Sequence, residues 1–165
     1  MSIEERVKAA MEGKKMVMLL TIAEECGITE QQAAHALPSQ MRAFCGGDKF
    51  NAVWQGLTTW PGATFIMRHG GSVVEIKGRI PAGKDGGGYF NLEHGAPLGG
   101  HIRSSEVAEI CFLSLPFMGL ESHSVQFFDA AGAVLFSVYV GRENRVLIPE
   151  ALEGFQAMRQ EFGKE

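Results

Sequence analysis

SHSVQFFDAAGAVLFSVYV, residues 122–140, contains two runs of β-branched and aromatic residues on either side of Asp129-Ala130-Ala131-Gly132. Such runs flanking a short turn predict a β-hairpin. In the second run, Val134, Phe136, Val138 and Val140 fall on one face of the strand, and the residues between them fall on the other. Because strands joined by short turns pair antiparallel, this stretch predicts an antiparallel sheet.

A second hairpin is expected earlier in the chain. Residues 63–68 and 72–77 have strand character, and His69-Gly70-Gly71 separates them. Residues 107–115 form a further predicted strand. The sheet therefore has at least five predicted strands.

Helices are predicted on both sides of these strands. In the first forty residues Gly27 is a helix stop and Thr29 an N-cap, and Pro38 ends the second helix of a predicted helical hairpin. Asp48 can cap a helix whose apolar stripe is Phe50, Val53, Trp54 and Leu57. Pro149 opens a last helix, which can cover the sheet with Leu152, Phe155, Met158 and Phe162. We therefore expect an α+β fold, with an antiparallel sheet, flanking helices, an N-terminal helical hairpin and a C-terminal helix.

Composition indicates an ordinary globular protein. A length of 165 residues, 45% apolar and 21% charged, predicts a single domain over 1–165 that includes an N-terminal helical segment, 1–45. The net charge of −4 predicts no nucleic-acid partner. Three widely spaced cysteines suit a reducing compartment. The charged first residues and the short apolar run 16–20 predict neither a signal peptide nor a membrane span, so we expect a cytoplasmic protein.

Residues 83–100 carry seven glycines around Tyr89-Phe90-Asn91-Leu92 and lead into His101. The run lacks both the ending of a phosphate-binding loop and the strand–helix context of a dinucleotide site. Two interpretations remain open: a mobile loop around a short strand, or small residues that let a flat ligand approach the backbone. No zinc-ligand spacing and no nucleophile elbow occur, so no catalytic residue is assigned.

Several short motifs follow one another in a fixed order. They are Gly47-Asp48-Lys49-Phe50 with Val53-Trp54, Gly88-Tyr89-Phe90-Asn91-Leu92, Gly100-His101-Ile102, Phe117-Met118-Gly119 and Phe127-Phe128. In order and spacing the chain resembles the intracellular haem-utilisation carriers called HutX, HuvX or ChuX, from about Leu37 to the C-terminus. The N-terminal helices agree in pattern more than in residues.

The resemblance implies a protein that binds haem and passes it to a separate haem-degrading enzyme. It also implies a homodimer whose paired subunits imitate the double-length haem proteins of the HemS and ChuS type. Tyr89 and His101 match positions implicated in binding across the family. Some relatives carry a histidine in the strand after the tryptophan-containing helix; an ungapped comparison puts Arg68 there and His69 one place later. Because a shift of one residue reverses the face of a strand, a ligand role for His69 requires a bulged turn.

Haem iron accepts an axial imidazole or phenolate, so His101 and Tyr89 are alternative ligands. Each residue also has a structural role that needs no iron. His101 can be a turn histidine bonded to the backbone, and Tyr89 can pack beside Phe90. A phenol must lose its proton, which ferric iron or a neighbouring cation assists. Basic side chains can meet the haem propionates; the candidates are Arg68, Arg79, Lys84 and Arg103.

Two other functions are considered. A haem-degrading enzyme of the HemS or ChuS type would share the ligands, since the oxygen chemistry belongs mostly to the cofactor. The single-repeat length favours the carrier. A helix-turn-helix regulator is disfavoured because the predicted recognition helix, 30–37, contains no lysine or arginine.

Overall fold

The computed structural model describes all 165 residues. Helices pack on both faces of an antiparallel sheet. The helices are α1 (Ile3–Met11), α2 (Leu19–Cys26), α3 (Glu30–Ala36), α4 (Phe50–Leu57) and α5 (Pro149–Phe162). The six strands of the main sheet are β1 (Arg42–Gly46), β2 (Ala63–His69), β3 (Ser72–Gly78), β7 (Glu109–Phe117), β8 (Leu120–Phe128) and β9 (Val134–Val140). Their order is β1-β7-β8-β9-β2-β3. The predicted α+β fold class is confirmed.

Both predicted hairpins are present, as β8–β9 and β2–β3. In the first, the Asp129 carboxylate accepts hydrogen bonds from the backbone N–H groups of Ala131 and Ala133, which closes the turn. The predicted alternation of faces fails at one end of β9. A register shift between Phe127 and Phe128 marks a bulge. As a result Val134 packs against the N-terminal helices, whereas Phe136 lies in the core on the opposite face.

The larger core lies between one face of the sheet and the two helices α4 and α5. The predicted stripe of α4 is buried there, and Trp54 is fully enclosed. Phe155 and Met158 of α5 are buried in the same core, as predicted. The expected helix cap by Asp48 is wrong: a 3-10 turn, Gly47–Lys49, leads directly into α4 without a side-chain cap.

The opposite face of the sheet carries the N-terminal helices, which number three rather than the two of the predicted hairpin. They pack on Phe44, Cys111 and other residues of β1 and β7. The predicted boundary between α2 and α3 is confirmed, because Gly27 adopts φ +64° and Thr29 forms a capping box with Gln32. The first strand, β1, begins at Arg42, inside the segment 1–45 that was expected to be helical.

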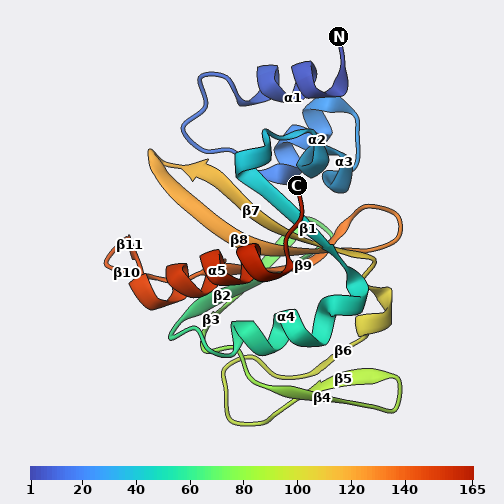
Figure 1. Cartoon of the computed structure of the whole chain (residues 1–165), viewed down its shortest axis with the longest axis vertical. Coiled ribbons are helices and arrows are strands. Elements are labelled where there is room, and N and C mark those ends of the chain that lie inside the picture. The colour runs from blue at the N-terminus through green and yellow to red at the C-terminus, as the bar shows by residue number, and fades with distance from the viewer.

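A second, three-stranded sheet covers α4 at the far end of the molecule from α1–α3 (Figure 1). Its strands are β4 (Gly83–Gly86), β5 (Tyr89–Leu92) and β6 (His101–Ile102). The glycines of the turn between β4 and β5, Gly87 and Gly88, have φ of +62° and +83°, as a two-residue hairpin turn requires. The segment expected to be a loop around one strand is therefore a hairpin plus a third strand. A small hairpin, β10 (Arg142–Glu143) and β11 (Val146–Leu147), precedes α5.

Candidate functional site

Strand β5 divides its side chains between the core and the outer surface of the small sheet. Phe90 and Leu92 are buried against α4, while Tyr89 and Asn91 point the other way. The Trp54 indole N–H donates to the Pro81 carbonyl at 2.8 Å, which ties the start of the small sheet to α4. The pleat of β5 therefore sets Tyr89 on a supported outer surface.

The two predicted iron ligands lie together on this outer surface. Asn91 pairs directly with His101 across β5 and β6, and the ring centroids of Tyr89 and His101 are 6.0 Å apart. Both side chains are exposed, Tyr89 by 38%. A phenol and an imidazole are ligand types that haem iron accepts, so these residues fit that group.

Arg103 completes this cluster and lies two residues beyond His101. Its Nη2 donates to the Tyr89 hydroxyl oxygen at 2.7 Å, and its guanidinium carbon is 4.9 Å from the centre of the tyrosine ring. A cation in this position stabilises negative charge on the phenol oxygen. The structure thus gives Arg103 a partner in Tyr89, in addition to the predicted role beside a propionate.

Asn91 was not predicted as a site residue, although it stands inside the quoted motif. Its Oδ1 lies 2.7 Å from Nδ1 of His101. Only the pairing register of β5 and β6 brings the two together. We call Tyr89, Asn91, His101 and Arg103 the tyrosine–histidine cluster.

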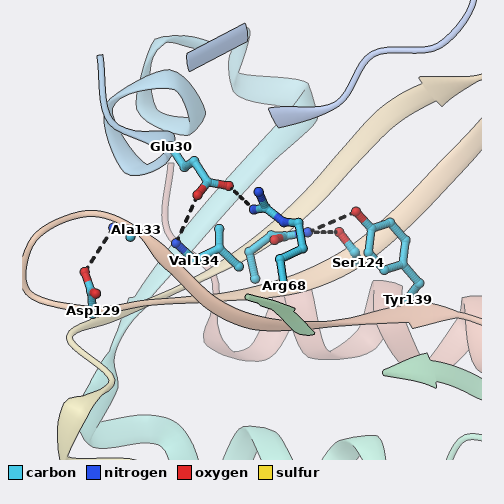
Figure 2. Close-up of polar contacts among 8 residues, drawn as sticks. Glu30, Arg68, Ser124, Asp129, Ala133, Val134 and Tyr139 are labelled. Atoms are coloured by element: carbon cyan, nitrogen blue, oxygen red, sulfur yellow. Dashed lines mark hydrogen bonds and ion pairs between the residues drawn. The ribbon is translucent and has the colours of Figure 1, made fainter. Parts of the chain in front are cut away.

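Arg68 lies elsewhere, on the face of the main sheet opposite the larger core. Its Nη2 donates to Glu30 Oε2 at 2.5 Å, and Glu30 Oε1 accepts from the Val134 N–H at 3.3 Å. Figure 2 shows this carboxylate of α3 placed between the arginine and the strand. Arg68 therefore fastens the N-terminal helices to the sheet.

Arg68 also lines a cavity of about 420 Å³ between the α1–α2 connection and the sheet. Serine, glutamine and tyrosine side chains form its floor; they include Ser124, Gln126, Ser137 and Tyr139. Gln126 donates to both Ser124 and Tyr139 (Figure 2). Methionine, leucine and phenylalanine side chains also line the cavity; they include Met16, Met18, Leu115 and Phe117.

The cavity contains no histidine or cysteine. Burial raises the pKa of its one tyrosine, Tyr139. Its basic residues are Arg68, Lys77 and Arg142. The cavity was not predicted, although the polar residues alternating through Ser122, Ser124 and Gln126 are a sequence signal for a polar sheet face.

His69 belongs neither to the tyrosine–histidine cluster nor to the lining of the cavity. The β2–β3 pairing continues without a bulge up to His69 and Ser72, so His69 points to the face opposite Arg68. The structure thus lacks the bulged turn that a ligand role for His69 required. His123 is buried, with one ring nitrogen bonded to Ser114 and the other to Glu121.

Comparison with known proteins identifies the family. Residues 43–158 match the family described as haem utilisation ChuX/HutX. The chain is 36% identical over 162 residues to the intracellular heme transport protein HutX of Vibrio cholerae serotype O1, covering 97% of this chain and 84% of that protein. The structure of the heme binding protein ChuX superposes with a TM-score of 0.86 at 28% identity, covering 97% and 98% of the two chains. The chain belongs to the ChuX/HutX haem-utilisation family.

A longer protein shares the fold. The structure of the heme degrading enzyme ChuS of Escherichia coli O157:H7 gives a TM-score of 0.80 at 14% identity, over 95% of this chain and 48% of ChuS. This chain therefore corresponds in fold to about half of ChuS. Separately, none of the helices is both long and apolar enough to cross a membrane.

The Arg68–Glu30 pair gives a first testable prediction. Arg68→Met and Glu30→Gln should each lower the free energy of unfolding by about 1–3 kcal/mol, because each leaves a partly buried polar partner unmatched. The glutamine side chain of the second variant retains an oxygen that can accept from the Val134 N–H. The double variant should lose less than the sum of the two, by about 1 kcal/mol. Urea denaturation measures all four proteins, and strict additivity would show that the pair does not couple α3 to the sheet.

Proposed function

We propose that this protein is an intracellular carrier that binds haem as cargo and passes it to a separate haem-degrading enzyme. The observation that carries the proposal is the tyrosine–histidine cluster, in which two side chains able to bind iron lie together and exposed. The functions named for HutX and ChuX, heme transport and heme binding, support it.

Tyr89 and His101 are the alternative iron ligands in this proposal. Arg103 assists the phenolate form of Tyr89 through its hydrogen bond to the phenol oxygen. His101 binds iron in its neutral form. One dominant protein ligand suits a carrier, because cargo held by a single bond is released more easily than cargo held by two.

Hemin titration tests binding and separates the ligands. Wild-type protein should give a saturable Soret shift at about one haem per subunit. If Tyr89 is the dominant ligand, Tyr89→Phe should remove the phenolate charge-transfer band; if His101 is, His101→Ala should cause the larger change. Tyr139→Phe and His94→Ala are the matched controls. His94 is exposed in the loop before β6, and Tyr139 lies in the cavity.

The control variants should keep the wild-type axial-ligand spectrum. Absence of saturation in the wild-type protein would overturn haem binding. Unchanged spectra and affinity in both Tyr89→Phe and His101→Ala would show that haem binds away from the cluster.

The carrier and the enzyme differ in the fate of the haem ring. After addition of reductant and oxygen, with catalase present to remove peroxide, the Soret band of the bound haem should remain largely intact. This result is expected of a protein that holds haem without directing oxygen chemistry at its iron. Chromatography of the extracted pigment provides the measurement, and clean formation of a ring-opened product would replace the carrier with an enzyme.

We also propose that the protein acts as a homodimer. The length of ChuS supports this assembly, because this chain covers only 48% of it. The exposed apolar side chains that line the cavity, Met16, Met18 and Phe117, provide surface for the second copy.

The dimer would also complete the haem site. The tyrosine–histidine cluster has candidate iron ligands on an open surface, whereas the cavity has walls and basic residues but no histidine or cysteine. The two lie on opposite sides of the main sheet, so one haem cannot contact both within a subunit. In a twofold dimer, the cluster of one subunit can close the cavity of the other, and symmetry then forms two equal sites.

Mixed dimers test this arrangement. One variant lacks the ligands, Tyr89→Phe with His101→Ala; the other has a blocked cavity, Ser122→Phe. Each alone should bind hemin poorly, because every site in its homodimer is damaged. After subunit exchange in an equal mixture, about half of the dimers should be heterodimers, each with one intact site. The mixture should therefore bind about one haem per four subunits.

Two results would contradict the shared site. One is full hemin binding by Ser122→Phe alone, which would mean that the cluster works without the cavity. The other is a wild-type protein that sediments as a monomer of 17.9 kDa at micromolar concentration.

A further inference from the structure

The orientation of the Asn91 side chain is determined by the backbone around it. Its Nδ2 lies 3.1 Å from the Lys84 carbonyl oxygen, 3.0 Å from that of Gly86 and 3.3 Å from that of Tyr89. Carbonyl oxygens accept hydrogen bonds and cannot donate them, so the NH₂ group must face this side. The amide oxygen consequently faces His101.

This orientation determines which nitrogen of His101 carries the proton. Nδ1 of His101 lies 2.7 Å from Asn91 Oδ1, and an amide oxygen only accepts, so Nδ1 must be the donor. A neutral imidazole has one N–H, which leaves Nε2 with a free electron pair. The tautomer is thus assigned by the hydrogen bonds of the β4–β5 hairpin.

We propose that Asn91 is a positioning residue, which holds His101 in the Nδ1–H tautomer and presents Nε2 as the nitrogen that binds haem iron. The proposal rests on the proposed haem function. A histidine ligand is commonly held in this way, with its second nitrogen bonded to an acceptor. Here the acceptor is held in turn by three carbonyls, so the imidazole is already oriented before iron arrives.

Two variants of Asn91 separate this role from a structural one. Asn91→Asp keeps an oxygen that accepts from His101, whereas Asn91→Leu removes it. Both lose the NH₂ group and so lose the same hydrogen bonds to the carbonyls of residues 84, 86 and 89. Asn91→Asp also sets a carboxylate oxygen against these carbonyl oxygens, so the hairpin should loosen at least as much in Asn91→Asp as in Asn91→Leu. Far-UV circular dichroism and amide exchange measure the loosening in both variants.

The first measurement uses the haem-free protein. Long-range ¹H–¹⁵N correlation spectra, recorded above the pH range in which imidazole titrates, report the tautomer of His101; His101→Gln assigns its signals. Wild-type protein and Asn91→Asp should show the Nδ1–H tautomer, and Asn91→Leu should show a large Nε2–H population. A wild-type His101 with its proton on Nε2 would overturn the proposal.

The second measurement is hemin titration of the same proteins. Asn91→Leu should bind hemin about 10-fold more weakly than Asn91→Asp and should lose the imidazole contribution to the spectrum, because residues that hydrogen-bond to a metal ligand have effects of this size. Equal spectra and affinities in the two variants would overturn the positioning role. Failure of wild-type protein to bind hemin would instead overturn the proposed function, while the tautomer measurement would still decide what Asn91 does to His101.

Discussion

The strict alternation of side chains along β8 is the constraint on which the two faces of the molecule depend. From Ser124 to Phe128 this strand is paired on both sides, with β7 and β9, so its side chains determine what each face becomes. Val125 and Phe127 enter the core beneath α4 and α5, while Ser124 and Gln126 form the polar floor of the cavity. A slip of one residue would place the serine and glutamine in the apolar core, which makes any other register costly.

The same alternation of side chains along a strand determines the two faces of the small sheet. Phe90 is drawn into the core beside Phe50 and Trp54, and the pleat then directs Tyr89 and Asn91 outward. Gly83 has to be small because a side-chain carbon there would collide with the Phe90 ring. Packing against Phe90 thus explains Gly83, and the hairpin turn explains Gly87 and Gly88. This hairpin places Tyr89 and Asn91 on the outer surface of the small sheet.

Local pattern was enough to predict the elements whose signal is contained in one stretch of chain. The β8–β9 hairpin, the stripe of α4 and the stripe of α5 each follow from periodicity and turn residues alone. Periodicity did not predict the face on which Val134 lies, because the bulge that sets it depends on how two strands pair. The helix α1 was not distinguished from its neighbours, and Asp48 was misjudged because Gly47–Lys49 forms a 3-10 turn.

The site was predictable in part for the same reason. Tyr89 and His101 were found through motifs, and their proximity is a property of the β5–β6 pairing. The contact between Asn91 and His101 depends on the β5–β6 pairing register, and the cavity depends on the packing of the α1–α2 connection over the sheet. Arg68 illustrates the limit: its basic side chain suggested a propionate partner, yet its nearest charged group is the Glu30 carboxylate of the same chain.

The separation of the cluster from the cavity bears directly on how a carrier can both hold and release haem. Ligands enclosed within one subunit would require that subunit to open before an acceptor could reach the iron. In the proposed dimer the walls belong to one subunit and the ligand to the other, so a small movement between subunits exposes the haem while each subunit keeps its fold. In that dimer, apolar contacts would hold the porphyrin without direction, and one oriented bond would hold the iron, so exchange would need only a competing ligand on the acceptor. Division of the site between two copies would thus allow release without unfolding, which a single deep pocket would not.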